Sequence, residues 1–154
     1  METDQEKEQN KKRFMAVMRR PIFFIVVNFF LINTLFAFLP YGLGDISYHL
    51  GRIAVIFYTG WLVVRRNLGG FGHAALAGAG IYFIDHVLLK GGLFLLQYWF
   101  RSEEMGLAAF SSVIVSFVGF APLAMLIAAA GGLSARGRKE RSPAVPPESP
   151  DSSG

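Results

Sequence analysis

The sequence predicts an all-α integral membrane protein: a bundle of four transmembrane helices with both termini inside and a disordered cytoplasmic C-terminal tail. The first observation is composition, because 53% of the residues are hydrophobic and only 17% are charged. The second is the placement of lysine and arginine, which alternates between rich and poor segments along the chain. The third is that the apolar residues gather in four long blocks, at about 21–39, 46–64, 71–90 and 106–130.

Each block is long enough to cross a membrane as a helix. A helix needs about 20 residues, at about 1.5 Å each, to cross a hydrocarbon core of about 30 Å. Lipid offers no hydrogen bonds to an exposed backbone, so a helix that satisfies its own is the expected structure. We therefore place a transmembrane domain at 21–133, between a basic N-terminal segment, 1–20, and a polar tail, 134–154.

The two ends of the chain are polar. Residues 1–12 carry acidic and basic side chains together, and we expect them to be loose. The tail from Ser134 is rich in proline, serine and charge, so it cannot bury enough apolar surface to offset its chain entropy and is expected to be disordered. Block one has a long acidic and basic leader and no A-x-A site after Leu39, which favours an uncleaved first helix over a signal peptide.

Basic residues predict the orientation of the helices. They flank block one on its N-terminal side, follow block two and follow block four, whereas the other two connections are poor in them. Cytoplasmic loops carry the excess of lysine and arginine, so both termini are expected inside a plasma membrane or a bacterial inner membrane. The same side chains are candidates for contact with lipid headgroups. They are Lys11, Lys12, Arg13, Arg19, Arg20, Arg65 and Arg66.

Block two has to include charged residues in order to span. Its uncharged run, 53–64, holds 12 residues, which is too short to cross a membrane. The helix must therefore take in His49 and Arg52. Asp45, His49 and Arg52 are spaced at i, i+4 and i+7, and so share one helix face.

Block three leaves two structures open. From Phe71 to Phe100 it has 30 residues, so it either tilts as one helix or breaks at Gly91–Gly92. Ala74 and Gly78 are spaced four apart, a pattern that permits close helix packing. We favour packing within one chain over a dimer contact for this face.

Polar side chains in all four blocks are expected to share one layer of the outer half of the membrane. Counting from the inner end of each helix at about 1.5 Å per residue gives heights of about 18 to 21 Å. Because a charge at that depth costs several kcal/mol unless it is paired or wet, we expect an ion pair between Arg52 and Asp85. The whole expected cluster is Arg52, Asp85, His49, His86, Asn33 and Ser116.

The polar cluster has two possible roles. In the first, which we favour slightly, the pair fixes helix register. In the second, the cluster lines a wet pocket for an ion, a proton or a small polar solute. The most favoured function is a non-catalytic membrane protein that binds or assembles with another membrane component, and the alternative is a subunit of a small-solute or ion transporter or channel.

Composition narrows the remaining possibilities. The chain has no cysteine, which excludes disulfides, thiolate metal sites and cysteine nucleophiles. No catalytic motif, cofactor motif or metal-ligand spacing is visible, so we expect no enzyme activity, no cofactor and no metal. The net charge is +4, but the basic residues flank apolar blocks, so nucleic acid is not expected as a partner. The expected partners are the lipid bilayer and either a second copy of the chain or another membrane protein.

Overall fold

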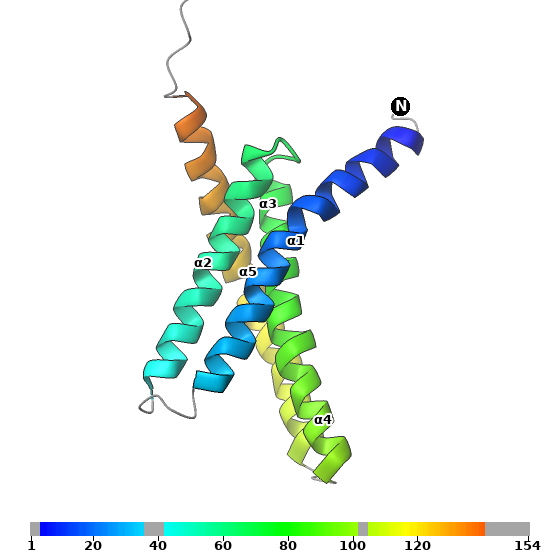
Figure 1. Ribbon diagram of the computed structural model, residues 1–154, viewed down its shortest axis with the longest axis vertical. Helices are drawn as coiled ribbons and strands as arrows, with labels where there is room; N and C mark the ends of the chain where they lie inside the picture. The colour runs from blue at the N-terminus through cyan, green and yellow to red at the C-terminus, as the bar shows by residue number, and fades with distance from the viewer. Residues whose placement is uncertain (1–3, 36–41, 102–104, 141–154) are drawn as a thin grey trace, which may run out of the picture.

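The computed structural model describes residues 4–35, 42–101 and 105–140, and these residues form helices without a strand. Figure 1 shows the helices as a bundle whose lower half opens into two arms. One arm holds the end of α1 and the start of α2, and the other holds α4 and the start of α5. The elements in chain order are α1 (Asp4–Leu35), α2 (Leu43–Arg65), α3 (Phe71–Phe83), the π-helix η1 (Ile84–Gly91), α4 (Gly92–Arg101) and α5 (Met105–Glu140).

Three stretches of the described residues are long and apolar enough to cross a membrane. They are Glu8–Thr34, Phe71–Leu96 and Ala109–Gly137. The prediction of an all-helical protein with membrane-length helices is therefore confirmed for three helical stretches. α2 lies outside this set because His49 and Arg52 lower its hydropathy.

α1 begins earlier than the sequence predicts. Residues 4–12, expected to be loose, are helical, and the helix continues through Pro21 to Leu35. The early start has a local cause, since Glu8 and Lys12 form an ion pair of 2.8 Å one turn apart. In Figure 1 this N-terminal part leans away from the other helices.

The second membrane-length stretch, Phe71–Leu96, is one continuous helical path rather than two segments. The possible break at Gly91–Gly92 does not occur, because Gly92 keeps α-helical angles of φ −61° and ψ −39°. Instead the hydrogen-bond register changes to π-helix over Ile84–Gly91. A π-helix is rare and is frequently found at functional sites. Here it contains Asp85 and His86.

α5 also extends past the predicted boundary. The disordered tail was expected from Ser134, but the helix continues to Glu140, and the rest of the expected tail lies outside the described residues. Alanine, lysine, arginine and glutamate, which favour helix, dominate the extension 135–140. At 36 residues and about 1.5 Å each, α5 is longer than a hydrocarbon core is thick.

Small residues bring α2, α3 and α5 close together. A Cβ atom at Gly60 would meet the carbonyl oxygen of Ala128, and one at Gly78 would meet the Ala128 side chain. A Cβ atom at Gly131 would meet the carbonyl oxygen of Phe57. Ala74 is fully buried, so the small-residue face of α3 packs within the chain, as favoured.

The outward faces of the helices are strongly apolar. Val115 and Leu126 on α5 are 73% and 67% exposed, and Phe23 on α1 is 62% exposed. In water such a surface would be unfavourable, whereas in a bilayer it contacts acyl chains.

The close packing at Gly60 predicts a large difference between two similar substitutions. Gly60→Ala places a methyl group against backbone that cannot move aside, so we expect a loss of about 1–3 kcal/mol of stability. Gly80→Ala meets nothing within 4 Å and adds helix propensity, so stability should hold or rise. Thermal unfolding in detergent measures both, and equal melting temperatures would contradict the packing described.

Candidate functional site

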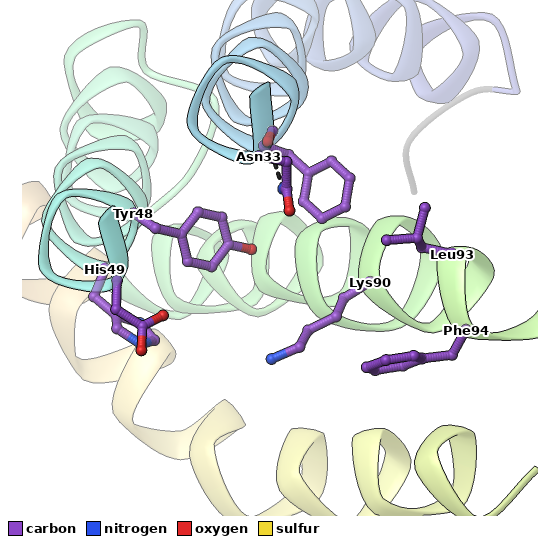
Figure 2. Close-up of a pocket in the computed structure, with 8 residues that line it drawn as sticks. Asn33, Tyr48, His49, Lys90, Leu93 and Phe94 are labelled. Carbon is purple, nitrogen blue, oxygen red and sulfur yellow. Dashed lines mark hydrogen bonds between the residues drawn. The ribbon is translucent and has the colours of Figure 1, made fainter. Parts of the chain in front are cut away.

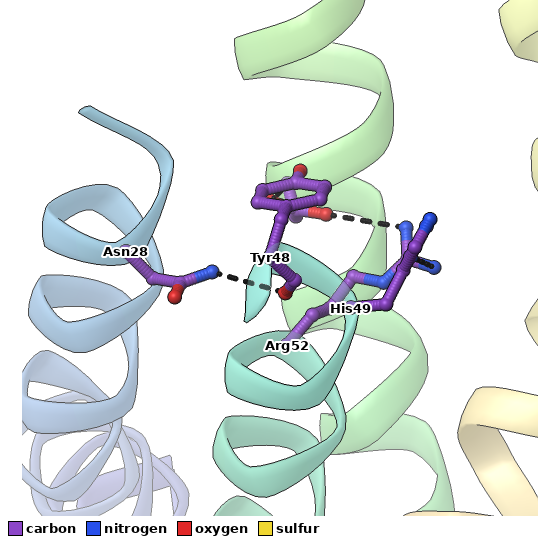
Figure 3. A network of polar contacts seen from close by, with 5 residues as sticks. Asn28, Tyr48, His49 and Arg52 are labelled. Carbon is purple, nitrogen blue, oxygen red and sulfur yellow. Dashed lines mark hydrogen bonds and ion pairs between the residues drawn. The ribbon is translucent and has the colours of Figure 1, made fainter. Parts of the chain in front are cut away.

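The carboxylate of Asp85 is the centre of the polar site. Asp85 lies on η1 and is fully buried. The hydroxyl of Tyr48 on α2 donates a hydrogen bond of 2.6 Å to its Oδ1 atom. The Nη1 atom of Arg52 lies 3.6 Å from its Oδ2 atom (Figure 3). The ion pair that the sequence predicts between α2 and the third block is therefore present.

Arg52 is held on several sides. Its guanidinium carbon lies 5.7 Å from the centre of the Tyr48 ring and 5.1 Å from that of Tyr82. Its Nη2 atom lies 2.8 Å from Nδ1 of His49. A guanidinium can only donate, so Nδ1 of His49 accepts and the ring proton sits on Nε2. Both aromatic faces and the carboxylate stabilise the positive charge.

α1 joins the cluster through the backbone of α2. The side-chain amide of Asn28 donates a hydrogen bond of 3.4 Å to the carbonyl oxygen of Tyr48. Close approach is possible because the neighbouring turn of α2 carries Gly51, where a Cβ atom would meet the Asn28 amide. Asn28 thus links α1 to the turn of α2 that presents Tyr48.

The other expected members of the cluster lie apart from the ion pair. His86 is buried and stacks on Tyr82 at 5.2 Å, but neither ring nitrogen has a hydrogen-bond partner among the described residues. Asn33 donates instead to Phe29 of its own helix at 2.6 Å. Ser116 is half-buried on α5. Of the side chains expected around the pair, His49 therefore bonds Arg52, whereas Asn33 and His86 make no hydrogen bond to the pair.

Sequence reasoning missed the aromatic members of the site. Tyr48 precedes Arg52 by four residues and Tyr82 precedes Asp85 by three, so both spacings place the tyrosine on the face of a charged residue. That spacing was the available signal. Tyrosine at a membrane helix end is ordinary, however, and gives no indication of burial on its own.

A pocket of about 360 Å³ lies beside the cluster (Figure 2). Residues of α1 and α2 line one side of it and residues of η1 and α4 the other, so it lies where the two arms seen in Figure 1 separate. α4 packs on α5 but, among the described residues, not on α1 or α2. The polar groups that line the pocket come from α1, α2 and η1, and the apolar wall includes Phe29, Leu93 and Phe94. The polar residues are Asn33, Asp45, Tyr48, His49 and Lys90.

The expected headgroup or topology residues gather at the opposite end. Two hollows of about 510 and 420 Å³ are lined by Arg19 and Arg20 of α1 and by Arg65 and Arg66 at the end of α2. The remaining ones are exposed on the part of α1 that leans away from the bundle; they are Lys11, Lys12 and Arg13. Among the described residues, no group of three His, Asp or Glu side chains is placed to hold a metal ion.

The ion pair predicts a pattern in a double-mutant cycle. Arg52→Met or Asp85→Leu alone leaves an unpaired buried charge, so each should lower stability by about 3–5 kcal/mol. The double variant removes both charges and should be more stable than either single variant. Tyr48→Phe removes one hydrogen bond to a charged group and should cost about 1.5–3 kcal/mol.

Thermal or denaturant unfolding of the four proteins in one detergent gives the coupling energy. Additive effects of Arg52→Met and Asp85→Leu would show that the two side chains do not stabilise each other. Thr34→Ala serves as a control, because Thr34 is exposed and bonds only the carbonyl oxygen of Phe30 on its own helix.

Comparison with known proteins assigns no family to the chain. No protein-family model, no curated protein and no solved structure matches it. A function for the chain therefore rests on the geometry of the cluster, the pocket and the arginine-rich end.

Proposed function

We propose that α2 is a fourth membrane-crossing helix and that both termini are cytoplasmic. α2 packs against α1, α3 and α5, so the lipid-unfavourable side chains of Tyr48 and Arg52 face protein rather than acyl chains. The start of α1, the α2–α3 connection and the end of α5 lie at one end of the bundle (Figure 1). Arginines occur in all three segments, which is typical of a cytoplasmic side. The membrane is a plasma membrane or a bacterial inner membrane.

The proposed activity is non-catalytic binding of another membrane component. One observation carries it: a pocket with both charge signs, from Asp45 and Lys90, opens beside a cluster that is already closed. Asp85 is neutralised by Tyr48 and Arg52 of its own chain, which makes the cluster a structural lock. In the pocket, polar groups of α1, α2 and η1 remain accessible to another molecule where the two arms separate. A second copy of the chain or another membrane protein would cover it.

A specific observation favours a second function. Oδ2 of Asp85 and both ring nitrogens of His86 are buried without a hydrogen-bond partner among the described residues. Such groups in a membrane-length helix mark pathways for ions, protons or small solutes. The π-helical register around them is also typical of functional sites. The alternative is therefore a subunit of a small-solute or ion transporter or channel.

Single-cysteine labelling separates the two functions, because the chain has no native cysteine. Maleimides react with thiolate, which forms only where water is present. For the binding protein we expect a membrane-impermeant maleimide to label Lys90→Cys and Asn33→Cys from outside, and to leave His86→Cys unlabelled. Labelling of His86→Cys as well would favour the transport function.

Two control variants make the labelling result decisive. Val115→Cys lies on the exposed apolar face of α5 and should not react in protein inserted in a membrane. Asn67→Cys, in the α2–α3 connection, should react only after the membrane is permeabilised. If neither pocket cysteine reacts in folded protein isolated as a monomer, in which no partner covers the pocket, the pocket is closed and the proposed binding role is wrong. Reaction of Asn67→Cys from outside would reject the proposed topology.

A further inference from the structure

We infer that the arginine-rich end holds a binding site for the phosphodiester headgroup and adjoining acyl chain of an anionic phospholipid. The inference rests on the membrane placement proposed above and goes beyond it, since it assigns a ligand class to residues far from the pocket between the arms. Two adjoining hollows form the site, and they share Arg20 and Tyr58. We call the one that contains Arg65 and Arg66 the arginine hollow, and the one that contains Phe23 and Phe24 the phenylalanine hollow.

The arginine hollow has the chemistry of a phosphate site. Its volume is about 420 Å³, and Arg20 of α1 converges on it with Arg65 and Arg66 from the end of α2. Among the described residues, no carboxylate lines it. The planar guanidinium group matches a phosphate with paired N–H donors, which makes arginine well suited to this ligand. Three arginines from two helices without a counter-charge leave a site that favours an anion.

The arginine hollow is partly preorganised by aromatic rings. The guanidinium of Arg65 lies 4.5 Å from the centre of the Trp61 ring. Trp61 is stacked with Tyr58 at 5.9 Å, and Tyr58 packs edge-on against Phe24 of α1 at 6.2 Å. Arg65 is thereby oriented by a chain of contacts that extends to α1. Less side-chain entropy is lost on binding when a donor is already placed.

The phenylalanine hollow distinguishes a phospholipid from a free phosphate. Its volume is about 510 Å³, and Phe23, Phe24 and Ala16 of α1 and Tyr58 of α2 line it beside Arg19 and Arg20. Phe23 and Phe24 are 62% and 48% exposed, directly beside the arginines. A soluble anion would contact only the arginines and would leave the phenylalanine surface beside them uncovered. An amphiphile fills both compartments at once, with its headgroup among the arginines and its chain along the phenylalanines.

The single tryptophan near the site gives a direct readout. The chain has two tryptophans, so Trp99→Phe leaves Trp61 as the reporter. We would reconstitute this variant in phosphatidylcholine vesicles that contain a small fraction of brominated phosphatidylglycerol or brominated phosphatidylcholine. Bromine quenches tryptophan on contact. We expect brominated phosphatidylglycerol to reach the same quenching of Trp61 at a mole fraction at least about fivefold lower than brominated phosphatidylcholine. This is the effect of one or more basic contacts to an anionic lipid.

Matched variants test whether the named arginines carry the preference. Arg20→Gln combined with Arg65→Gln should abolish it. Arg13→Gln removes the same charge from an exposed site on α1 outside both hollows and should retain it. All these positions are exposed, so folding should survive, and thermal unfolding checks this. If the double variant fails to fold, Arg66→Gln alone should still reduce the preference.

Each remaining outcome decides the inference. Inorganic phosphate added in excess should leave the phosphatidylglycerol preference in place, and its loss would assign the site to a free anion instead. Equal quenching by the two brominated lipids would overturn the lipid site while leaving the membrane placement standing. Absence of quenching by either lipid would overturn both, because Trp61 would not contact a bilayer.

Discussion

The neutralisation of one buried carboxylate determines how the helices are arranged. Asp85 has no exposure, and an isolated charge in such a place is unstable by several kcal/mol. Tyr48 and Arg52 of α2 bind this carboxylate by a hydrogen bond and an ion pair, and these two contacts set the rotation of α2 and its height against η1. Asn28 then binds the backbone of the same turn, so α1 takes its position from α2.

The bundle divides into a tightly packed part and an open part. Gly60, Gly78 and Gly131 allow α2, α3 and α5 to touch backbone to backbone. At the polar cluster itself the helical register changes to π-helix over Ile84–Gly91. Beyond it α4 packs against α5 and, among the described residues, not against α2. The ion pair of Arg52 and Asp85 lies between these parts. The closed part supplies rigidity, and the two ends present chemically different surfaces, one of mixed charge and one rich in arginine.

The features that the sequence predicts correctly are those that lipid penalises strongly. Long apolar blocks and a lone opposite-charge pair have few alternatives in a bilayer, so the helices and the contact of Arg52 with Asp85 follow from residue type and spacing. The remaining features depend on contacts between distant segments. Burial of Tyr48 needs the position of Asp85, and the change to π-helix leaves no periodic signature in the sequence. The extensions of α1 and α5 were missed because polar residues also form good helices in water.

The polar bonds also imply an order of insertion during synthesis. α1 is made before α2, and its Asn33 and Thr34 side chains bond carbonyl oxygens of their own helix, so these two side chains need no partner helix. α2 is different, because the counter-charge for Arg52 is made 33 residues later, on η1. In the proposed four-pass topology, α2 would therefore settle in lipid only together with the following membrane-length stretch, Phe71–Leu96. The two helices would then leave the translocation machinery as a pair. Release of α2 alone would expose the unpaired charge of Arg52 to lipid and would be the step at which insertion fails most easily.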